Sequence, residues 1–414
     1  MPDPTPRRIY LVAGEASGDA HGARLIEALG QQEPSLTFEG LGGMKMQAAG
    51  MRLDYDLAGE GIMGFVEVLK HAPRLTRLIK TTAAKLRANP PAALVLIDYP
   101  GFNIRLAKLL EGSGIPVIYY ISPQVWAWKK GRIHTLAKVC RKMLVIFPFE
   151  EKLYQEVGLD VAFVGHPLVE HVAGMKEEVG ELWSSRDSMP QEVVPESKVQ
   201  DVRMHQSPPT ETVPHSPAPG NTSHVIGLLP GSRAQEIARV FPPMLKLARA
   251  LSKERPGLRF VAPCVNDARA EQIRKLAKDF PLDILTGGMH DVLSTARFCL
   301  VASGTATLET AVFGVPMIIL YRVSPITYAL ARLLVDIKHI GMVNILAGRE
   351  VVPEHVQSIR VPHILPQALS LIDDTPARQQ MLHDLDAVRQ MLGGGGASQR
   401  AAQEILAVLN NGTP

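Results

Sequence analysis

Cysteine is scarce in this chain of 414 residues, which has only Cys140, Cys264 and Cys299. Their spacing fits neither a zinc site nor a disulfide framework, so we expect reduced thiols that serve packing. Aromatic residues make up 5% of the chain, and no apolar run approaches the roughly 18 uncharged residues that a membrane-spanning helix needs. Any contact with a membrane is therefore expected to be peripheral.

The chain also lacks a large excess of charge of one sign, since 44 Lys and Arg residues nearly balance 41 Asp and Glu residues. The formal net charge of +3 gives no reason to expect a nucleic-acid partner. The polar segment Met1–Arg8 runs directly into a predicted strand and has no apolar stretch typical of a secretory signal. We therefore expect a cytoplasmic protein.

Short apolar strands alternate with amphipathic helical segments on both sides of a polar stretch. The expected strands are Ile9–Val12, Thr37–Leu41, Ala93–Ile97, Val117–Tyr120, Met143–Ile146, Ala162–Val164, Val225–Leu229, Arg259–Ala262, Ile284–Leu285, Phe298–Val301 and Met317–Leu320. Apolar strands separated by helices are typical of parallel sheets that are covered on both faces. The sequence therefore predicts an α/β protein with two doubly wound, Rossmann-like domains.

Residues 184–223 separate the two halves and contain seven prolines and no aromatic residue. Such a stretch cannot bury enough apolar surface to offset the entropy of ordering, which predicts a flexible linker or insertion. The predicted domains are then 1–183 and 224–392. After Pro325 the chain is expected to be mostly helical, and 393–414 to form a helix that packs on the first domain or on a partner subunit.

Ligands of open parallel sheets lie beyond the carboxyl ends of the strands, where five motifs stand. The first comprises Gly14, Glu15, Ser17, Gly18 and Asp19. Its turn of small residues into a helix can bind an anion. Alternatively, Ser17 or Asp19 only caps the helix. The spacing differs from G-x-G-x-x-G, so it does not favour a dinucleotide.

The second motif is Ile97–Asn103, in which Asp98 ends a strongly apolar strand. A carboxylate at a strand end that faces a cleft is well placed to act as a general base. Alternatively, Asp98 or Asn103 caps the following helix.

The third motif, Ile121–Arg132, contains Ser122, the tryptophans Trp126 and Trp128, and three cations. Such a cluster can bind a sugar face, a phosphate or a membrane interface. The alternative is a Trp pair packed into the core beside a solvated basic turn.

The fourth motif comprises Gly231, Ser232 and Arg233, directly after the first strand of the second half. Arg233 would begin a helix, where a cation opposes the helix dipole unless it faces a bound diphosphate. A guanidinium suits such an anion because its donors form a fixed fork. An exposed surface arginine is the alternative.

The fifth motif comprises Ser303, Gly304 and Thr305, which lead from a strand into a helix N-terminus that favours a phosphate. Glu309 lies one helical turn after Thr305, where its carboxylate can accept ribose hydroxyls. Glu309 as a capping-box residue is the alternative, but the spacing from Thr305 is one residue too long.

Asp54-Tyr55-Asp56 has the D-x-D form that some sugar transferases use to hold a metal. Two carboxylates are too few to define a site, and the segment does not follow a strong strand. We expect no metal, because Arg233 and a helix N-terminus can neutralise a leaving diphosphate.

A basic amphipathic segment over 61–80 is the candidate lipid surface. Its apolar members are Ile62, Met63, Phe65, Val66 and Leu69, and Lys, His and Arg residues follow them. Exposed apolar residues beside cations are typical of a membrane-surface helix. An ordinary helix covering the sheet is the alternative, and the run Tyr328–Leu334 has the same ambiguity.

Taken together, the motifs resemble those of the lipid-A-disaccharide synthases. The segments that carry the resemblance, in the family's order, are Gly14–Asp19, Ile97–Asn103, Ser122–Trp128, Leu229–Arg233, Ser303–Glu309 and Asn344–Glu350. The resemblance covers most of the chain outside 184–223, which looks inserted, and Gln124 stands where a small residue is more usual. It implies a GT-B-type fold and an inverting transfer from UDP-2,3-diacylglucosamine to 2,3-diacylglucosamine 1-phosphate. The products would be a β-1,6-linked disaccharide 1-phosphate and UDP.

The resemblance also implies roles for single residues. Asp98 matches an essential aspartate and Arg233 an essential arginine, while Glu309 and Asn344 match residues near bound UDP. The expected UDP-sugar site comprises Gly231, Ser232, Arg233, Ser303, Gly304, Thr305, Glu309 and Asn344. The expected acceptor site comprises Gly14, Glu15, Ser17, Gly18, Asp19, Asn103, Ser122 and Trp126.

The implied enzyme needs no cofactor and works at the inner face of the inner membrane in the biogenesis of a Gram-negative outer membrane, with a second copy of the chain as a candidate partner in a homodimer. Two alternatives stay open on the same scaffold: a UDP-N-acetylglucosamine-type epimerase and a nucleotide-sugar-binding protein without catalysis. An epimerase would act without an acceptor and would need no lipid-facing surface.

Overall fold

The computed structural model describes residues 7–59, 65–126, 131–170, 172, 224–324, 328 and 338–411, with the side chains of 65–71 left out. The chain forms two compact units. The first comprises residues 1–170, 323–351 and 384–414, and the second comprises 171–322 and 352–383. The predicted linker 184–223 lies outside the described residues, as do 329–334 of the run that starts at Tyr328.

The first unit is built on a parallel sheet of seven strands in the order β3-β2-β1-β4-β5-β6-β7. Its strands are β1 (Arg8–Ala13), β2 (Thr37–Gly42), β3 (Arg52–Asp56), β4 (Ala93–Ile97), β5 (Val117–Tyr120), β6 (Lys142–Val145) and β7 (Val161–Phe163). Its helices are α1 (Ala16–Gln32), α2 (Met44–Ala48), α3 (Phe65–Ala88), α4 (Pro100–Leu109), α5 (Arg132–Val139), α6 (Pro148–Gln155), α13 (Met342–Ala347) and α16 (Ala397–Asn411).

The second unit is built on a parallel sheet of six strands in the order β10-β9-β8-β11-β12-β13. Its strands are β8 (Val225–Leu229), β9 (Arg259–Cys264), β10 (Asp283–Thr286), β11 (Phe298–Ala302), β12 (Met317–Tyr321) and β13 (Glu354–Val356). Its helices are α8 (Ala234–Glu254), α9 (Asp267–Ala277), α10 (Met289–Thr295), α11 (Thr305–Val312) and α14 (Val361–Ile372), and α15 (Pro376–Met391) runs from this unit into the first.

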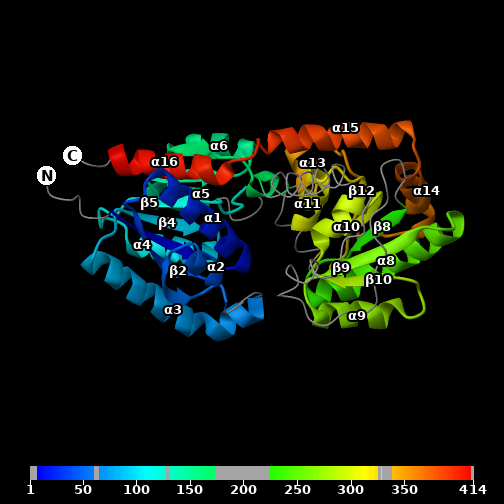
Figure 1. Ribbon diagram of the computed structural model, residues 1–414, viewed down its shortest axis with the longest axis horizontal. Coiled ribbons are helices and arrows are strands. Elements are labelled where there is room, and N and C mark those ends of the chain that lie inside the picture. The colour runs from blue at the N-terminus through cyan, green and yellow to red at the C-terminus, as the bar shows by residue number, and fades with distance from the viewer. Residues whose placement is uncertain are drawn as a thin grey trace, which may run out of the picture. The chain divides into compact units, whose positions relative to one another are not determined.

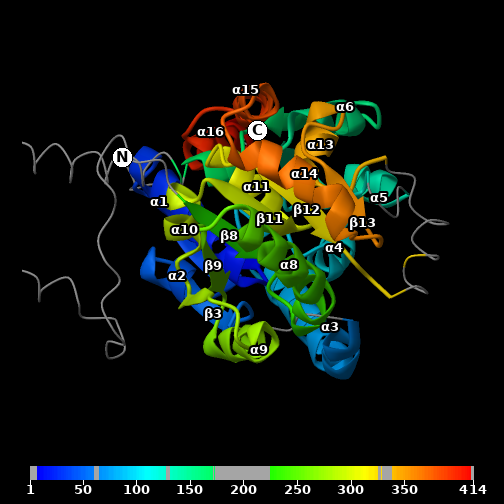
Figure 2. The same ribbon diagram turned by 90° about the vertical axis from the view of Figure 1, so that its right-hand side faces the viewer.

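Helices cover both faces of each sheet, as buried parallel strands require. In the first unit, Tyr10, Leu94 and Tyr119 share one core cluster with apolar residues of α3, α4 and α5. The opposite face packs against α1, which also contacts α16 (Figure 1). In the second unit, α8 packs on β11 and β12 with α14 beside it (Figure 2). The predicted α/β architecture is therefore confirmed, and each predicted strand is present.

Two strands were not expected from the sequence. Asp54 and Asp56 lie within β3, a strand that the sequence did not predict, so the D-x-D segment is part of a strand and does not follow one. β3 is an edge strand with one neighbouring strand, and its residues alternate in exposure. An edge strand of this kind buries few side chains, so its sequence RLDYD can be polar and lacks the apolar run by which the other strands were predicted. β13 likewise adds a short edge strand to a region that was expected to be mostly helical.

The carboxylates of the D-x-D segment are occupied within the protein. Asp54 accepts a hydrogen bond from the Tyr10 hydroxyl at 3.0 Å and pairs with Lys85. Asp56 accepts the backbone N–H of Gly59 at 2.7 Å. Across the described residues, no group of three or more His, Cys, Asp or Glu side chains is arranged to hold a metal ion. Within the same residues, no helix combines the length and the apolarity that crossing a membrane requires.

The last helix, α16, is an integral part of the first unit. Ala401 and Ile405 are fully buried, and Lys142 of β6 pairs with Glu404 at 2.6 Å. Arg400 donates to the backbone carbonyl of Val164 at 2.9 Å. The C-terminal segment thus completes the core on the face that α1 covers.

We predict that Ile405→Ala lowers the free energy of unfolding by about 2–5 kcal/mol, because it leaves a cavity where a buried side chain was. Urea denaturation followed by circular dichroism measures this, with the exposed Gln403→Ala as the matched control on the same helix. Equal losses in the two variants would mean that α16 is not part of the core.

Candidate functional site

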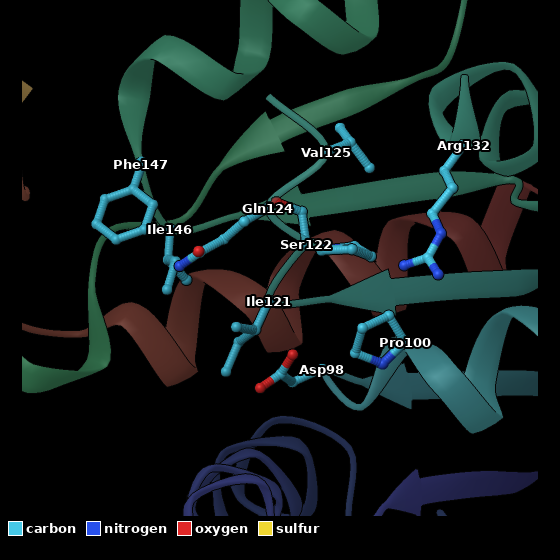
Figure 3. A pocket seen from close by; sticks show the side chains of 10 residues that line it. Asp98, Pro100, Ile121, Ser122, Gln124, Val125, Arg132, Ile146 and Phe147 are labelled. Carbon is cyan, nitrogen blue, oxygen red and sulfur yellow. The ribbon is translucent and has the colours of Figure 1, made fainter. Parts of the chain in front are cut away.

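A cavity of about 320 Å³ opens at the carboxyl ends of three neighbouring strands of the first unit. β4, β5 and β6 pair in register, so the residues that follow them meet at one edge of the sheet. The residues that line the cavity are Asp98, Pro100, Ile121, Ser122, Pro123, Gln124, Val125, Arg132, Ile146 and Phe147 (Figure 3). The predicted base Asp98 and the predicted acceptor residue Ser122 therefore lie in one pocket.

The backbone around this pocket is strained. Asp98 and Tyr99 are consecutive residues in the left-handed region, with φ of 44° and 46°, and the pocket residue Ile121 has φ of 63°. A β-branched residue there is a rare outlier, and each such residue costs on the order of 1–3 kcal/mol. Three of the five non-glycine residues with positive φ in the described part of the chain thus stand at this pocket.

Buried donors hold the strained turn in place. The Asp98 carbonyl accepts hydrogen bonds from the Tyr119 hydroxyl at 2.6 Å and from the Asn103 amide at 2.7 Å. The Asp98 N–H donates to the Tyr120 carbonyl at 3.0 Å. Asn103 is fully buried and does not line the pocket, so it supports the turn from the protein interior.

Asp98 has a strongly perturbed carboxyl group. Burial raises its pKa to about 6, the nearby Glu15 carboxylate adds to the rise, and the Tyr99 N–H opposes it. Glu15 follows β1, the strand that pairs with β4, which explains why the two acids are close. A carboxylate with a pKa near neutrality is matched to proton transfer at physiological pH.

The loop after β1 is fitted to the Asp98 turn. A Cβ atom on Gly14 would lie 2.1 Å from Cδ1 of the Tyr99 ring, so only glycine fits there. Ser17 is exposed and Gly18 is buried. Asp19 has a capping task, since its oxygens accept the N–H groups of Gly43 at 2.9 Å, Met46 at 3.0 Å and Lys45 at 3.1 Å, which begin α2.

Ser122 is linked to a second buried acid. Its hydroxyl donates to Glu150 at 2.6 Å, and Glu150 is 1% exposed. Burial raises the pKa of Glu150 to about 7, against the lowering effect of the Ser122 hydrogen bond. Trp126 packs edge-on against Phe149 with ring centroids 5.3 Å apart and is not among the lining residues. Residues 127–130 lie outside the described residues.

In the second unit, Gly231 has φ of 100° and a Cβ there would meet the Glu236 carboxylate. Arg233 is the N-cap residue of α8, and its guanidinium pairs with Glu236 at 3.0 Å while 71% of the side chain is exposed. Ser232 is exposed beside it. An exposed pair of this kind is weak, so an anionic ligand can displace Glu236 from Arg233 at little cost.

The turn after β11 forms the second predicted nucleotide motif. Gly304 has φ of 152° and ψ of −163°, a conformation essentially confined to glycine, and it precedes the exposed Thr305 at the start of α11. Burial raises the pKa of Glu309 to about 6, and its carboxylate lies 3.8 Å from His290. Ser303 is half-buried at the same turn.

The remaining predicted residues are placed as follows. Asn344 is fully buried, belongs to the first unit, and accepts the Val351 N–H at 2.8 Å. Ile62 and Met63 lie outside the described residues, and Phe65, Val66 and Leu69 lie on α3, where their side chains are not described. Farther along α3, Leu75 and Ile79 are buried while Arg77 and Lys80 are exposed. The predicted lipid role of the segment stays a prediction.

Two residues at these sites were not found from the sequence. Glu150 stands in the first turn of α6, where the helix dipole favours acidic residues in general. Its position in the sequence therefore does not indicate that it is buried. His290 stacks on Phe313 with centroids 5.4 Å apart beside Glu309, and only its place after the Gly287-Gly288 turn hinted at a strand end.

Comparison with known proteins gives full-length matches. A family profile described as lipid-A-disaccharide synthetase matches residues 9–215 and 217–407. The lipid-A-disaccharide synthase of Geobacter sulfurreducens is 37% identical over 412 residues, which is 99% of each chain. That of Myxococcus xanthus is 36% identical over 416 residues, 98% of this chain and 99% of the relative.

Solved structures match the fold at low sequence identity. The glycotransferase of kitacinnamycin superposes with a TM-score of 0.59 at 13% identity and covers 98% of this chain and 100% of its own. UDP-GlcNAc 2-epimerase from Neisseria meningitidis, bound to UDP-GlcNAc, gives a TM-score of 0.58 at 13% identity with the same coverage. The expected GT-B-like class is thus confirmed, and the fold alone does not separate a transferase from an epimerase.

We predict that Glu150→Gln stabilises the protein at alkaline but not at acid pH. The folded-state pKa of about 7 exceeds the ordinary 4.5, so the wild type loses stability as the pH rises from 4.5 through 7. The loss amounts to roughly 3 kcal/mol above pH 8, and glutamine avoids it because it does not ionise. Thermal unfolding at pH 4.5 and pH 8 measures this, with the exposed Glu156→Gln as control. A Glu150→Gln difference that does not depend on pH would contradict the raised pKa.

Proposed function

This chain belongs to the lipid-A-disaccharide synthetase family, and we propose that Asp98 is the general base with which it joins two acylated glucosamine units. The enzyme is a UDP-sugar-dependent hexosyltransferase of lipid A biosynthesis. The proposed donor is UDP-2,3-diacylglucosamine and the proposed acceptor is 2,3-diacylglucosamine 1-phosphate. Inversion at the anomeric carbon follows if the acceptor hydroxyl attacks directly from the face opposite UDP.

The observation that carries this proposal is the Asp98 carboxyl group in a cavity of the first unit. The strained turn aims it into the cavity, and burial together with Glu15 raises its pKa to about 6. The acceptor 6-hydroxyl is a poor nucleophile until it loses its proton. A base that is ionised at neutral pH, yet retains some proton affinity, takes that proton as the oxygen attacks.

In this proposal, residues of the second unit bind and stabilise the leaving UDP. Arg233 would exchange its exposed Glu236 partner for the diphosphate, and the N-terminal N–H groups of α11 after Gly304 would bind phosphate oxygens. Glu309 would accept hydrogen bonds from the ribose hydroxyls. Gly231, Ser232 and Ser303 would form the turns around the anion. Each charge-assisted hydrogen bond contributes about 1.5–3 kcal/mol, so a few of them lower a leaving-group barrier by orders of magnitude. No step needs a metal ion.

The acylated substrates also determine where the enzyme would act. Moving an acyl chain into water costs about 0.8 kcal/mol per methylene, so these substrates remain in a bilayer. We propose peripheral attachment at the inner face of the inner membrane through residues 61–80, whose described part carries the exposed cations Arg77 and Lys80 in the middle of α3. Cations there favour anionic headgroups.

We predict that Asp98→Asn lowers kcat/KM by about 10²–10⁴-fold, because the amide cannot take a proton. Asparagine adopts the left-handed conformation readily, so the turn and UDP binding persist. In the wild type, kcat/KM should fall about tenfold per pH unit below pH 6, since the protonated carboxyl is inactive as a base.

A second variant, Glu15→Gln, tests the pKa of Asp98 without removing its carboxylate. The Glu15 charge raises the pKa of Asp98, so its removal should move the acid limb of the pH profile to lower pH without abolishing activity. An Asp98→Asn enzyme with undiminished kcat/KM would refute Asp98 as the base, whereas a profile that Glu15→Gln leaves in place would contradict the influence of Glu15 on the pKa of Asp98.

We predict that UDP release depends on the acylated acceptor. A transferase converts donor to UDP only when an acceptor hydroxyl is present, whereas an epimerase turns over the donor alone. Incubation of the pure protein with UDP-diacylglucosamine, with and without acceptor, and quantification of UDP by chromatography measure this. UDP formation at the same rate in both reactions would overturn the transfer reaction.

A further inference from the structure

The Ser122 hydroxyl belongs both to the wall of the pocket and to a buried hydrogen bond. Ser122 follows β5 and lines the cavity together with Asp98, which follows the neighbouring strand β4 (Figure 3). The same hydroxyl donates to the Glu150 carboxylate at 2.6 Å. Glu150 is 1% exposed and is not among the lining residues, so it acts on a ligand in the pocket only through Ser122.

This hydrogen bond fixes the direction of the Ser122 proton. A serine hydroxyl has one proton to donate and two lone pairs that accept, whereas an ionised carboxylate only accepts. With its proton committed to Glu150, Ser122 offers only lone pairs to the pocket. A ligand group that meets Ser122 must therefore be a hydrogen-bond donor.

The surroundings of Glu150 favour the same direction. Burial raises the pKa of Glu150, and the Ser122 hydroxyl acts against this rise. The N–H groups of Phe147, Trp126 and Ile146 act in the same sense as the hydroxyl. The polar groups that influence Glu150 are thus donors that favour its ionised form, and the carboxylate is their common acceptor.

Tyr154 is a further polar side chain close to this pair. It lies on α6 with Glu150 and is fully buried, and both burial and the Glu150 charge raise its pKa. The Ser122 hydroxyl opposes this rise, yet the Tyr154 oxygen has no hydrogen-bond partner within the described part of the chain. The Ser122 proton therefore goes to Glu150 and not to Tyr154, which makes Tyr154 a control position.

The proposed acceptor has only two hydroxyls that can meet the wall of the pocket. In 2,3-diacylglucosamine 1-phosphate, C1 carries the phosphate and C2 and C3 carry the acyl groups, so the hydroxyls on C4 and C6 are the free ones. The C6 hydroxyl reacts at Asp98 in the proposed function. Because C4 and C6 are both bonded to C5, a sugar whose C6 hydroxyl meets Asp98 presents its C4 hydroxyl beside it.

We propose that Ser122, held by Glu150, accepts a hydrogen bond from the C4 hydroxyl of the acceptor and thereby places the C6 hydroxyl at Asp98. This inference rests on the proposed function, because it assigns a partner to a hydroxyl of that acceptor. Ser122 contacts the substrate, and Glu150 is a positioning residue that acts through it. An acceptor whose C4 substituent carries no proton leaves the Ser122 lone pairs without a partner, so the enzyme discriminates against it.

The test measures the selectivity for the C4 hydroxyl. Values of kcat/KM are compared in detergent for the proposed acceptor, its 4-deoxy analogue and its 4-deoxy-4-fluoro analogue. The pH is 8, where Glu150, with its pKa of about 7, is mostly ionised. Fluorine is close to a hydroxyl in size but has no proton to donate. The variants are Ser122→Ala and Glu150→Gln, with Tyr154→Phe as the matched control because it removes a neighbouring buried hydroxyl.

The wild type should lose about 10- to 100-fold in kcat/KM with both analogues, the worth of one hydrogen bond to a buried group, because neither analogue can donate. Ser122→Ala should use all three acceptors within about threefold of one another, since the partner of the C4 hydroxyl is gone. Tyr154→Phe should keep the selectivity of the wild type.

Glu150→Gln should reduce the selectivity by another route. The amide NH₂ group is repelled by the N–H groups around position 150 and turns toward Ser122, whose proton then points into the pocket. The proposed acceptor should lose its advantage, and the fluoro analogue should gain on the deoxy analogue.

Several results would overturn the inference. Equal use of the 4-deoxy and the proposed acceptor by the wild type would remove it outright, and undiminished selectivity in Ser122→Ala would assign the C4 hydroxyl to another partner. Undiminished selectivity in Glu150→Gln, or a loss in Tyr154→Phe that equals it, would contradict the positioning role of Glu150. Either variant alone decides if the other does not fold. Failure of the proposed function is distinct, since the wild type would then form no disaccharide from the proposed acceptor.

Discussion

The carbonyl oxygen of Asp98 is the atom on which the architecture of the pocket at the ends of β4, β5 and β6 depends. Two left-handed residues in succession would relax in a free chain, because each costs on the order of 1–3 kcal/mol. Here the Tyr119 hydroxyl and the Asn103 amide both donate to that carbonyl from the buried side. With the backbone held in this way, the side chain of Asp98 extends beyond the sheet and enters the cavity. The hydrogen bonds within the folded sheet thus keep the Asp98 carboxylate oriented into the cavity.

Two acids near one pocket, the half-buried Asp98 and the buried Glu150, have different roles because their surroundings differ. Burial raises the pKa of both, to about 6 for Asp98 and about 7 for Glu150. Asp98 lines the cavity, whereas Glu150 is sealed beneath Ser122 and anchors the loop that follows β5. The first can exchange a proton with a substrate, and the second can only hold the wall in place. Similar pKa values therefore correspond to different tasks, and access to the cavity decides which task applies.

Much of the fold was readable because a buried parallel strand is nearly all apolar and its ends are marked by glycine and small polar residues. Asp98 and Gly304 were found on that principle, since a strand end in an open sheet is where ligands bind. The edge strand β3 escaped because it fills little core and its sequence RLDYD is polar. The sequence offered Asp19 as a cap of α1, whereas it caps α2. This role and the burial of Glu150 were missed because partners 24 to 27 residues away and long-range burial leave no local pattern.

The central claim is that the Asp98 carboxylate meets the acceptor hydroxyl directly. An experimental structure of the Asp98→Asn protein with UDP and the phosphorylated acceptor would measure this. The account predicts that the C6 hydroxyl lies about 2.6–3.2 Å from the side-chain oxygen of residue 98, within hydrogen-bond reach. A complex in which that hydroxyl contacts another acid, with residue 98 facing away from the sugar, would contradict it.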